Sequence, residues 1–113
     1  MVVDNLISAL EGLGYPVKKQ GSILPEEAYP DHFFTYWNDS ADGDSYYSNE
    51  EGAIIWAYSV MFYSVDEPDT VLLEAKKLLK QAGFIVSGAG YDVASDEVTH
   101  TGRGITVLYR EQL

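Results

Sequence analysis

The side chains of this sequence that zinc prefers, histidine and cysteine, are few and far apart. The chain has two histidines, His32 and His100, and no cysteine. Zinc sites in proteins use three or four protein ligands. Neither Asp31 beside His32 nor Asp96 near His100 belongs to a motif that supplies the others. We interpret His100 as part of a hydrogen-bonded turn, because the surrounding residues 99–104 read THTGRG.

Residues 38–49 have a spacing that invites comparison with a calcium-binding EF-hand loop. Gly43 would occupy the sixth position of that loop, where a glycine permits the sharp turn. Asn49 stands at the twelfth position, which in an EF-hand holds a bidentate Glu, and no flanking helices are expected. We therefore predict an acidic loop between two strands and no metal site.

Gly88 and Gly90 follow an apolar segment, as do the first glycines of a dinucleotide-binding fingerprint. Val93 stands where the third glycine belongs, and no helix is expected to open there. A turn that uses glycine's access to positive φ explains the pair better. The sequence also lacks a nucleophile elbow of the form G-x-S-x-G. We therefore expect no cofactor and no enzymatic activity.

The aromatic side chains say more about function than the motifs above, because the chain has nine tyrosines and two tryptophans in 113 residues. Some of these rings must pack in the core. Tyr36, Trp37, Tyr46 and Tyr47 flank a polar segment, where amphipathic rings commonly contact partner proteins. Base stacking on nucleic acid would need nearby cations. The pattern therefore favours a protein interface.

The chain is strongly acidic, with 18 acidic and seven basic residues and a formal charge of −11. Binding to nucleic acid backbones or anionic lipids requires Lys and Arg. The charge therefore argues against both. It either keeps an aromatic-rich chain in solution or repels an anionic neighbour. No segment has the length and apolarity of a membrane span, so we expect no membrane contact.

The pattern of the first half predicts one helix and three strands in a single domain, residues 1–113. Asp4 is the expected helix N-cap, and Gly14 ends the helix. A short strand at 17–19 and a strand at 32–37 follow. Residues 38–45 are polar and are expected to form a loop, whereas 53–63 alternate as a strand. The even-numbered residues of that strand should face the core, and its odd face is apolar enough to be covered too.

The second half predicts another helix and two further strands. Asp66 is the expected cap of this helix, Pro68 lies in its first turn, and Gly83 ends it. Strands are expected at 84–86 and 105–109, with a short extended piece at 91–93 and a polar loop at 94–102. The order is α-β-β-β-α-β-β. It predicts an α+β fold, a mainly antiparallel sheet with two helices packed on it.

Four segments carry a resemblance to a known family. They read FFTYW at 33–37, WAYSVMFYSVD at 56–66, KLLKQAGF at 77–84 and THTGRG at 99–104. Together they resemble small tail-region proteins of phages and prophages of Gram-positive bacteria. The order of elements is similar to the tail terminator fold, which minor tail protein U shares with tail-completion and tail-to-head joining proteins.

This resemblance implies a structural role in the virion. Such proteins form a homo-oligomeric ring, a hexamer, that caps the tail tube protein and presents a surface to the head connector or stopper protein. DNA passes through the ring without tight binding. The protein would assemble in the host cytoplasm and then reside in the tail or neck of the virion. The family has no active-site residues to transfer to this chain.

Within that role, the polar segments 39–48 and 94–103 are the expected subunit contacts, and Arg103 could pair with an acidic neighbour across the ring. The candidate interface residues are Tyr36, Trp37, Asp42, Asp44, Tyr46, Tyr47, Asp96, His100 and Arg103. The alternative function is an acidic binding protein, monomeric or dimeric, that imitates the charge of DNA and inhibits an enzyme acting on nucleic acid. Dispersed acids favour the first function, since a mimic should align its carboxylates on one face.

Overall fold

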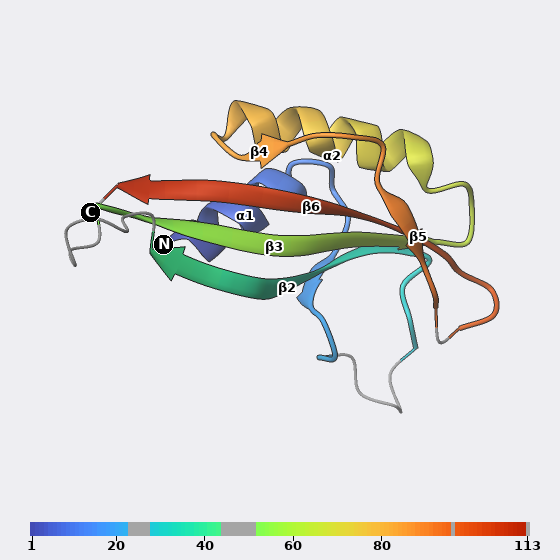
Figure 1. The fold of residues 1–113 in the computed structure, drawn as a ribbon. Helices are drawn as coiled ribbons and strands as arrows, with labels where there is room; N and C mark the ends of the chain where they lie inside the picture. Colours follow the sequence, from blue (N-terminus) through green and yellow to red (C-terminus); the bar gives the residue numbers. More distant parts are fainter. Residues whose placement is uncertain (23–27, 44–51, 96, 113) are drawn as a thin grey trace.

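Three strands of 12 residues each form the centre of a six-stranded sheet (Figure 1): β2 (His32–Gly43), β3 (Ala53–Ser64) and β6 (Thr101–Gln112). The computed structural model describes residues 1–22, 28–43, 52–95 and 97–112. Its elements are α1 Val2–Glu11, β1 Val17–Lys19, β2 His32–Gly43, β3 Ala53–Ser64, α2 Asp69–Gln81, β4 Ile85–Val86, β5 Tyr91–Val93 and β6 Thr101–Gln112.

The sheet is mixed and has the order β1-β2-β3-β6-β4, with β5 also paired to β6. Only the short β1 runs parallel to its neighbour among these pairs, and the other pairings are antiparallel. The α+β class and the two helices are confirmed. One strand more is present than the expected order contains, because residues 91–93 pair with residues 102–104 of β6.

Both helices pack on one face of the sheet. Leu6 and Leu10 of α1 and Leu79 of α2 are fully buried against that face. The even-numbered residues of β3 point toward the helices, and Val60 and Phe62 have no exposed surface. This confirms the predicted core face. Burying such side chains stabilises the fold by roughly 1.5–3 kcal/mol each.

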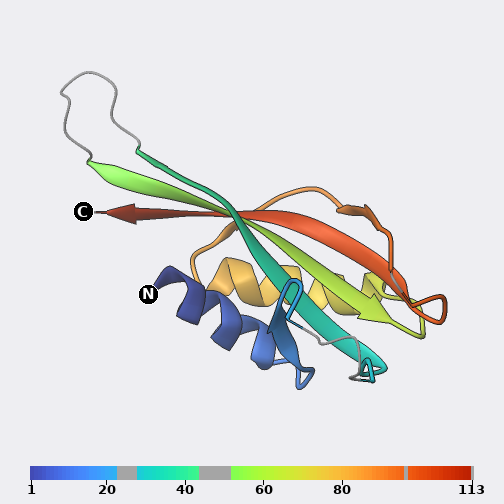
Figure 2. The same cartoon turned by 90° about the horizontal axis from the view of Figure 1, so that it is seen from below.

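On the opposite face of the sheet, the described residues form a buried cluster at one end. Phe33, Met61 and Tyr63 form a second buried cluster there, against which Tyr29 and Val93 pack. The apolar odd-numbered face of β3 is therefore covered in part, as its composition predicted. At the other end, β2 and β3 project beyond the helices (Figure 2).

Two expected loops contain strand residues. The expected polar loop at 38–45 is wrong for residues 38–43, which continue β2 and pair with residues 54–58 of β3. The expected loop at 94–102 and the strand at 105–109 also need correction, because β6 begins at Thr101 and reaches Gln112. In both places pairing with the full length of β3 outweighs the turn-forming composition of the segment.

The helix starts differ from the expected ones, whereas the helix end at Gly83 is confirmed by its φ of 96°. α1 begins at Val2, so Asp4 lies in its first turn and is not the N-cap. Before α2, the carboxylate of Glu67 accepts hydrogen bonds from the backbone N–H groups of Asp69 and Thr70. Glu67 thus does the capping that was expected of Asp66. No helix in the described ranges is long and apolar enough to cross a membrane.

The burial pattern of α2 gives a matched test of the core. Leu79→Ala should lower the free energy of unfolding by about 2–5 kcal/mol, because Leu79 is fully buried. Leu73→Ala is the control in the same helix, since its side chain is 55% exposed, and it should change stability by less than about 0.5 kcal/mol. Urea unfolding followed by circular dichroism measures both. Equal effects would contradict the described packing of α2.

Candidate functional site

The candidate interface residues that the structure describes lie on both faces of the sheet and do not come together in one site. By strand register, Tyr36 and Arg103 point toward the helices. Trp37 and Asp42 lie on the opposite face, and His100 packs against Phe33 on that face. The remaining candidates lie outside the described residues: Asp44, Tyr46, Tyr47 and Asp96.

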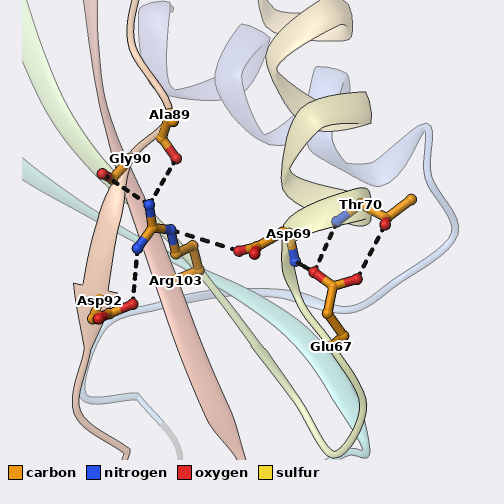
Figure 3. A network of polar contacts seen from close by, with 7 residues as sticks. All are labelled: Glu67, Asp69, Thr70, Ala89, Gly90, Asp92 and Arg103. Atoms are coloured by element: carbon orange, nitrogen blue, oxygen red, sulfur yellow. Dashed lines mark hydrogen bonds and ion pairs between the residues drawn. The ribbon is translucent and has the colours of Figure 1, made fainter.

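Arg103 is the centre of an extensive polar network among the described residues (Figure 3). Its Nη1 donates to Asp92 Oδ1 at 2.8 Å, and its Nη2 donates to the carbonyl oxygens of Ala89 and Gly90, each at 3.1 Å. Its Nε lies 3.6 Å from Asp69 Oδ1. The guanidinium thus links β6 to β5, to the 88–90 turn and to the start of α2. The partners that the structure gives Arg103 are in its own chain, and pairing across a ring stays a prediction.

Backbone geometry positions the acceptors around Arg103. Gly88 and Gly90 have φ values of 80° and 87°, which L-residues with a side chain rarely adopt. A Cβ atom on Gly90 would lie 2.4 Å from the carbonyl oxygen of Gly104. The glycine pair therefore serves a tight turn against β6, as its sequence predicted. At the other side of the network, Glu67 holds the N-terminus of α2 and with it Asp69 (Figure 3).

The far end of the sheet forms a three-stranded arm that consists of residues 38–43 of β2, 53–58 of β3 and 107–112 of β6. A β-bulge at Asp39 lies at the beginning of the arm in β2. Asn38 Nδ2 donates to the carbonyl oxygens of Ser40 and Ala57, and Ser59 Oγ donates to Asp39 Oδ2 at 2.6 Å. These side chains fix the bulge, which increases the local twist of the strand.

Trp37 lies next to the arm and is 48% exposed. Lys19 Nζ lies 5.6 Å from the centre of its ring, at cation–π distance. The ring is therefore accessible from solvent on one side, and its contact with a partner protein stays a prediction.

At the base of the arm, Trp56, Tyr58 and Tyr36 line the helix-facing side. Trp56 Nε1 donates to Glu111 Oε1 at 3.2 Å. Burial raises the pKa of Tyr58, and the nearby Glu111 carboxylate and Tyr36 raise it further. Tyr36 is thus part of the packing between the sheet and the helices. Trp37, the next residue in the chain, is exposed on the opposite face.

His100 belongs to a turn, as predicted. Its backbone N–H donates to the Glu97 carbonyl, and its Nε2 is 2.8 Å from the carbonyl oxygen of Pro30. Its ring packs edge-on against Tyr29 and Phe33. The imidazole of His100 therefore holds its own turn and the segment with Tyr29 and Pro30 against the sheet face that lies opposite the helices. A cavity of about 160 Å³ lies beside Tyr29 and Phe33.

Within the described ranges, no group of three or more His, Asp or Glu side chains is arranged to hold a metal ion. The polar groups that the structure brings together link elements of the fold. The exposed acids Asp39 and Asp42 remain on the arm, and the exposed ring of Trp37 lies beside it. Neither the models of known protein families nor the curated proteins compared with this chain match it.

Sequence reasoning missed the partners of the candidate residues. Asp69 and Asp92 contact Arg103 from 34 and 11 positions away in the chain, and only the fold brings them together. Lys19 beside Trp37 was missed for the same reason. One signal for this network was present in the sequence, the glycine pair at 88 and 90. It indicated a tight turn, but it did not indicate that the carbonyl groups of this turn bind Arg103.

The raised pKa of Tyr58 predicts a specific loss of stability at alkaline pH. A raised folded-state pKa means that the stabilisation is complete below the unfolded-state value of 10.0 and is lost as pH rises toward the folded-state pKa. The free energy of unfolding should therefore fall above about pH 10. Tyr58→Phe should flatten this fall, and Glu111→Gln should reduce it in part. Urea unfolding across alkaline pH measures the effect, and an unchanged slope in both variants would contradict it.

The Arg103 network predicts an asymmetry between its members. Arg103→Met should cost about 1–3 kcal/mol of unfolding free energy, because two backbone carbonyls and a carboxylate lose their donor. Asp92→Asn should change little, since its side chain is 96% exposed. Thermal unfolding of the two variants tests this directly. A larger loss for Asp92→Asn would show that the ion pair, and not the carbonyl contacts, holds the network.

Proposed function

We propose that this protein is a structural subunit of a phage or prophage tail, which forms a ring that terminates the tail tube or joins the tail to the head. It acts by contacting other proteins and does not transform a substrate. Its partners are further copies of itself, the tail tube protein and the head connector or stopper protein.

The single observation that supports this proposal most is the projecting arm. Its three strands contribute to an elongated molecule of 51 × 28 × 22 Å. Beside the arm, Trp37 exposes almost half of its surface, and Asp42 on the arm itself is also exposed. Long exposed strand edges are a liability for a protein that acts alone. In a ring subunit the same edges are available for contacts with neighbouring copies.

The segments that carry the family resemblance lie in the framework of this fold. Residues 33–37 are in β2, residues 56–64 are in β3, and residues 101–104 begin β6. They are direct neighbours in the sheet, since Phe33 pairs with Tyr63 and Phe62 pairs with Arg103. The fourth segment ends α2 and turns at Gly83. The resemblance therefore concerns one contiguous part of the structure.

The charge is compatible with a channel for DNA. Each chain has a formal charge of −11. A ring of such chains would repel the phosphate backbone and let DNA pass without retaining it.

Mass in solution and electron microscopy test the proposal. The purified chain, alone and mixed with tail tubes, should form rings with six times the 12.6 kDa mass of the chain, or should cap the tube ends. The same preparation should be mixed with a DNA-cleaving or DNA-unwinding enzyme. Tight one-to-one inhibition of that enzyme, with no rings and no capped tubes, would contradict the proposal and favour the DNA-mimic function.

A further inference from the structure

The arm has two outer strands, β2 and β6. Each of them has an outer edge without a strand partner among the described residues. β1 pairs with β2 only as far as Tyr36, so residues 38–43 of β2 have a partner on the β3 side alone. β4 pairs with β6 only at Val107 and Leu108, so residues 109–112 of β6 are in the same situation. Such edges present rows of backbone donors and acceptors that can pair with another strand.

A single row of side chains crosses the arm between these edges. Asp42 pairs with Ile55, and Ile55 pairs with Arg110, so the three side chains lie on the same face, the one away from the helices. Asp42 and Arg110 are both exposed, and Arg110 Nη1 also donates to Gln112 Oε1 of its own chain at 2.8 Å. The row thus has a carboxylate at one edge of the sheet and a guanidinium at the other.

We propose that neighbouring copies of this chain pair edge to edge, the β6 edge of one copy against the β2 edge of the next, with Arg110 beside Asp42 of that neighbour. The inference rests on the proposed ring-forming function and names the surface that forms the ring. The occupant of each edge is a second copy of this chain.

Charge selects this pairing over the symmetric one. Two β2 edges placed together would bring the acidic side chains of Asp39 and Asp42 close to their own copies, and like charges directly opposite each other are destabilising. Pairing β6 with β2 brings Arg110 to Asp42 and continues the row across the boundary. Contacts between two different surfaces generate rings when the rotation closes.

The strand directions allow this contact. β2 and β6 are each antiparallel to β3, so they run in the same direction. Copies related by simple continuation of the sheet would therefore form a parallel pair. Neighbouring strands lie about 4.8 Å apart. Side chains that adjoin in the row are thus within the Cα separation of about 4.4–6.8 Å that a disulfide spans.

Disulfide trapping tests the pairing, because the chain has no cysteine of its own. Asp42→Cys and Arg110→Cys are introduced into separate copies, one of which carries a size tag, and equal amounts are mixed and oxidised. The expected product is the mixed dimer, with little dimer from either variant alone. The matched control replaces Arg110→Cys with Lys80→Cys, which removes an exposed basic residue on α2, and should give no mixed dimer above background.

A charge exchange gives an independent readout. Asp42→Arg and Arg110→Asp should each weaken self-association about fivefold, and the double variant should restore it, as measured by sedimentation equilibrium. No excess of mixed dimer over the control, or no rescue in the double variant, overturns the edge pairing. If rings of the expected mass still form in that case, the ring-forming function stands and only the surface is wrong. If no rings and no capped tubes form either, both proposals fail.

Discussion

The structure depends on the pairing of β3 with a long strand on each side. β3 is apolar on both faces, and its second half is buried on both, with Val60 and Phe62 facing the helices and Met61 and Tyr63 facing away. A strand of this kind needs other elements packed on both of its faces as well as hydrogen-bonding partners at both edges. The two helices pack on one face. The connecting segments that contain His100 and Val93 pack on part of the other face. Arg103 then closes the network between the sheet, the 88–90 turn and α2.

The same constraint produces the arm. Because β2 and β6 follow β3 along its full length, they continue beyond the helices, where their outer edges have no strand partner among the described residues. The bulge fixed by Asn38 and Asp39 and the exposed Asp42 limit unspecific pairing at the β2 edge. The sequence therefore combines strong central pairing with charged strand edges, and in the proposed assembly these charges would favour one pairing of the edges over the other. This combination suits a subunit that assembles in one orientation.

The elements with a strong periodic pattern could be predicted from the sequence. The apolar alternation of β3 and the end of α2 at Gly83 were read correctly, because burial and glycine conformation act locally. Residues 38–43 were misread, since Asn, Asp, Ser and Gly are typical turn residues and only pairing with β3 makes them a strand. The start of β6 was misread for a similar reason. Its Gly102 and Gly104 leave room for the rings of Tyr63 and Tyr91, and that requirement is visible only in the fold. The partners of Arg103 depend on the same long-range arrangement.

Hydrogen–deuterium exchange of the chain before and after assembly tests the central claim most directly. If the arm recognises neighbouring copies through its edges, the amides of residues 39–43 and 109–112 should exchange more slowly in the assembled state. The amides of the central part of β3, which already pair on both sides, should not change. Protection confined to the exposed surfaces of α1 and α2, with unchanged exchange in the arm, would contradict the account.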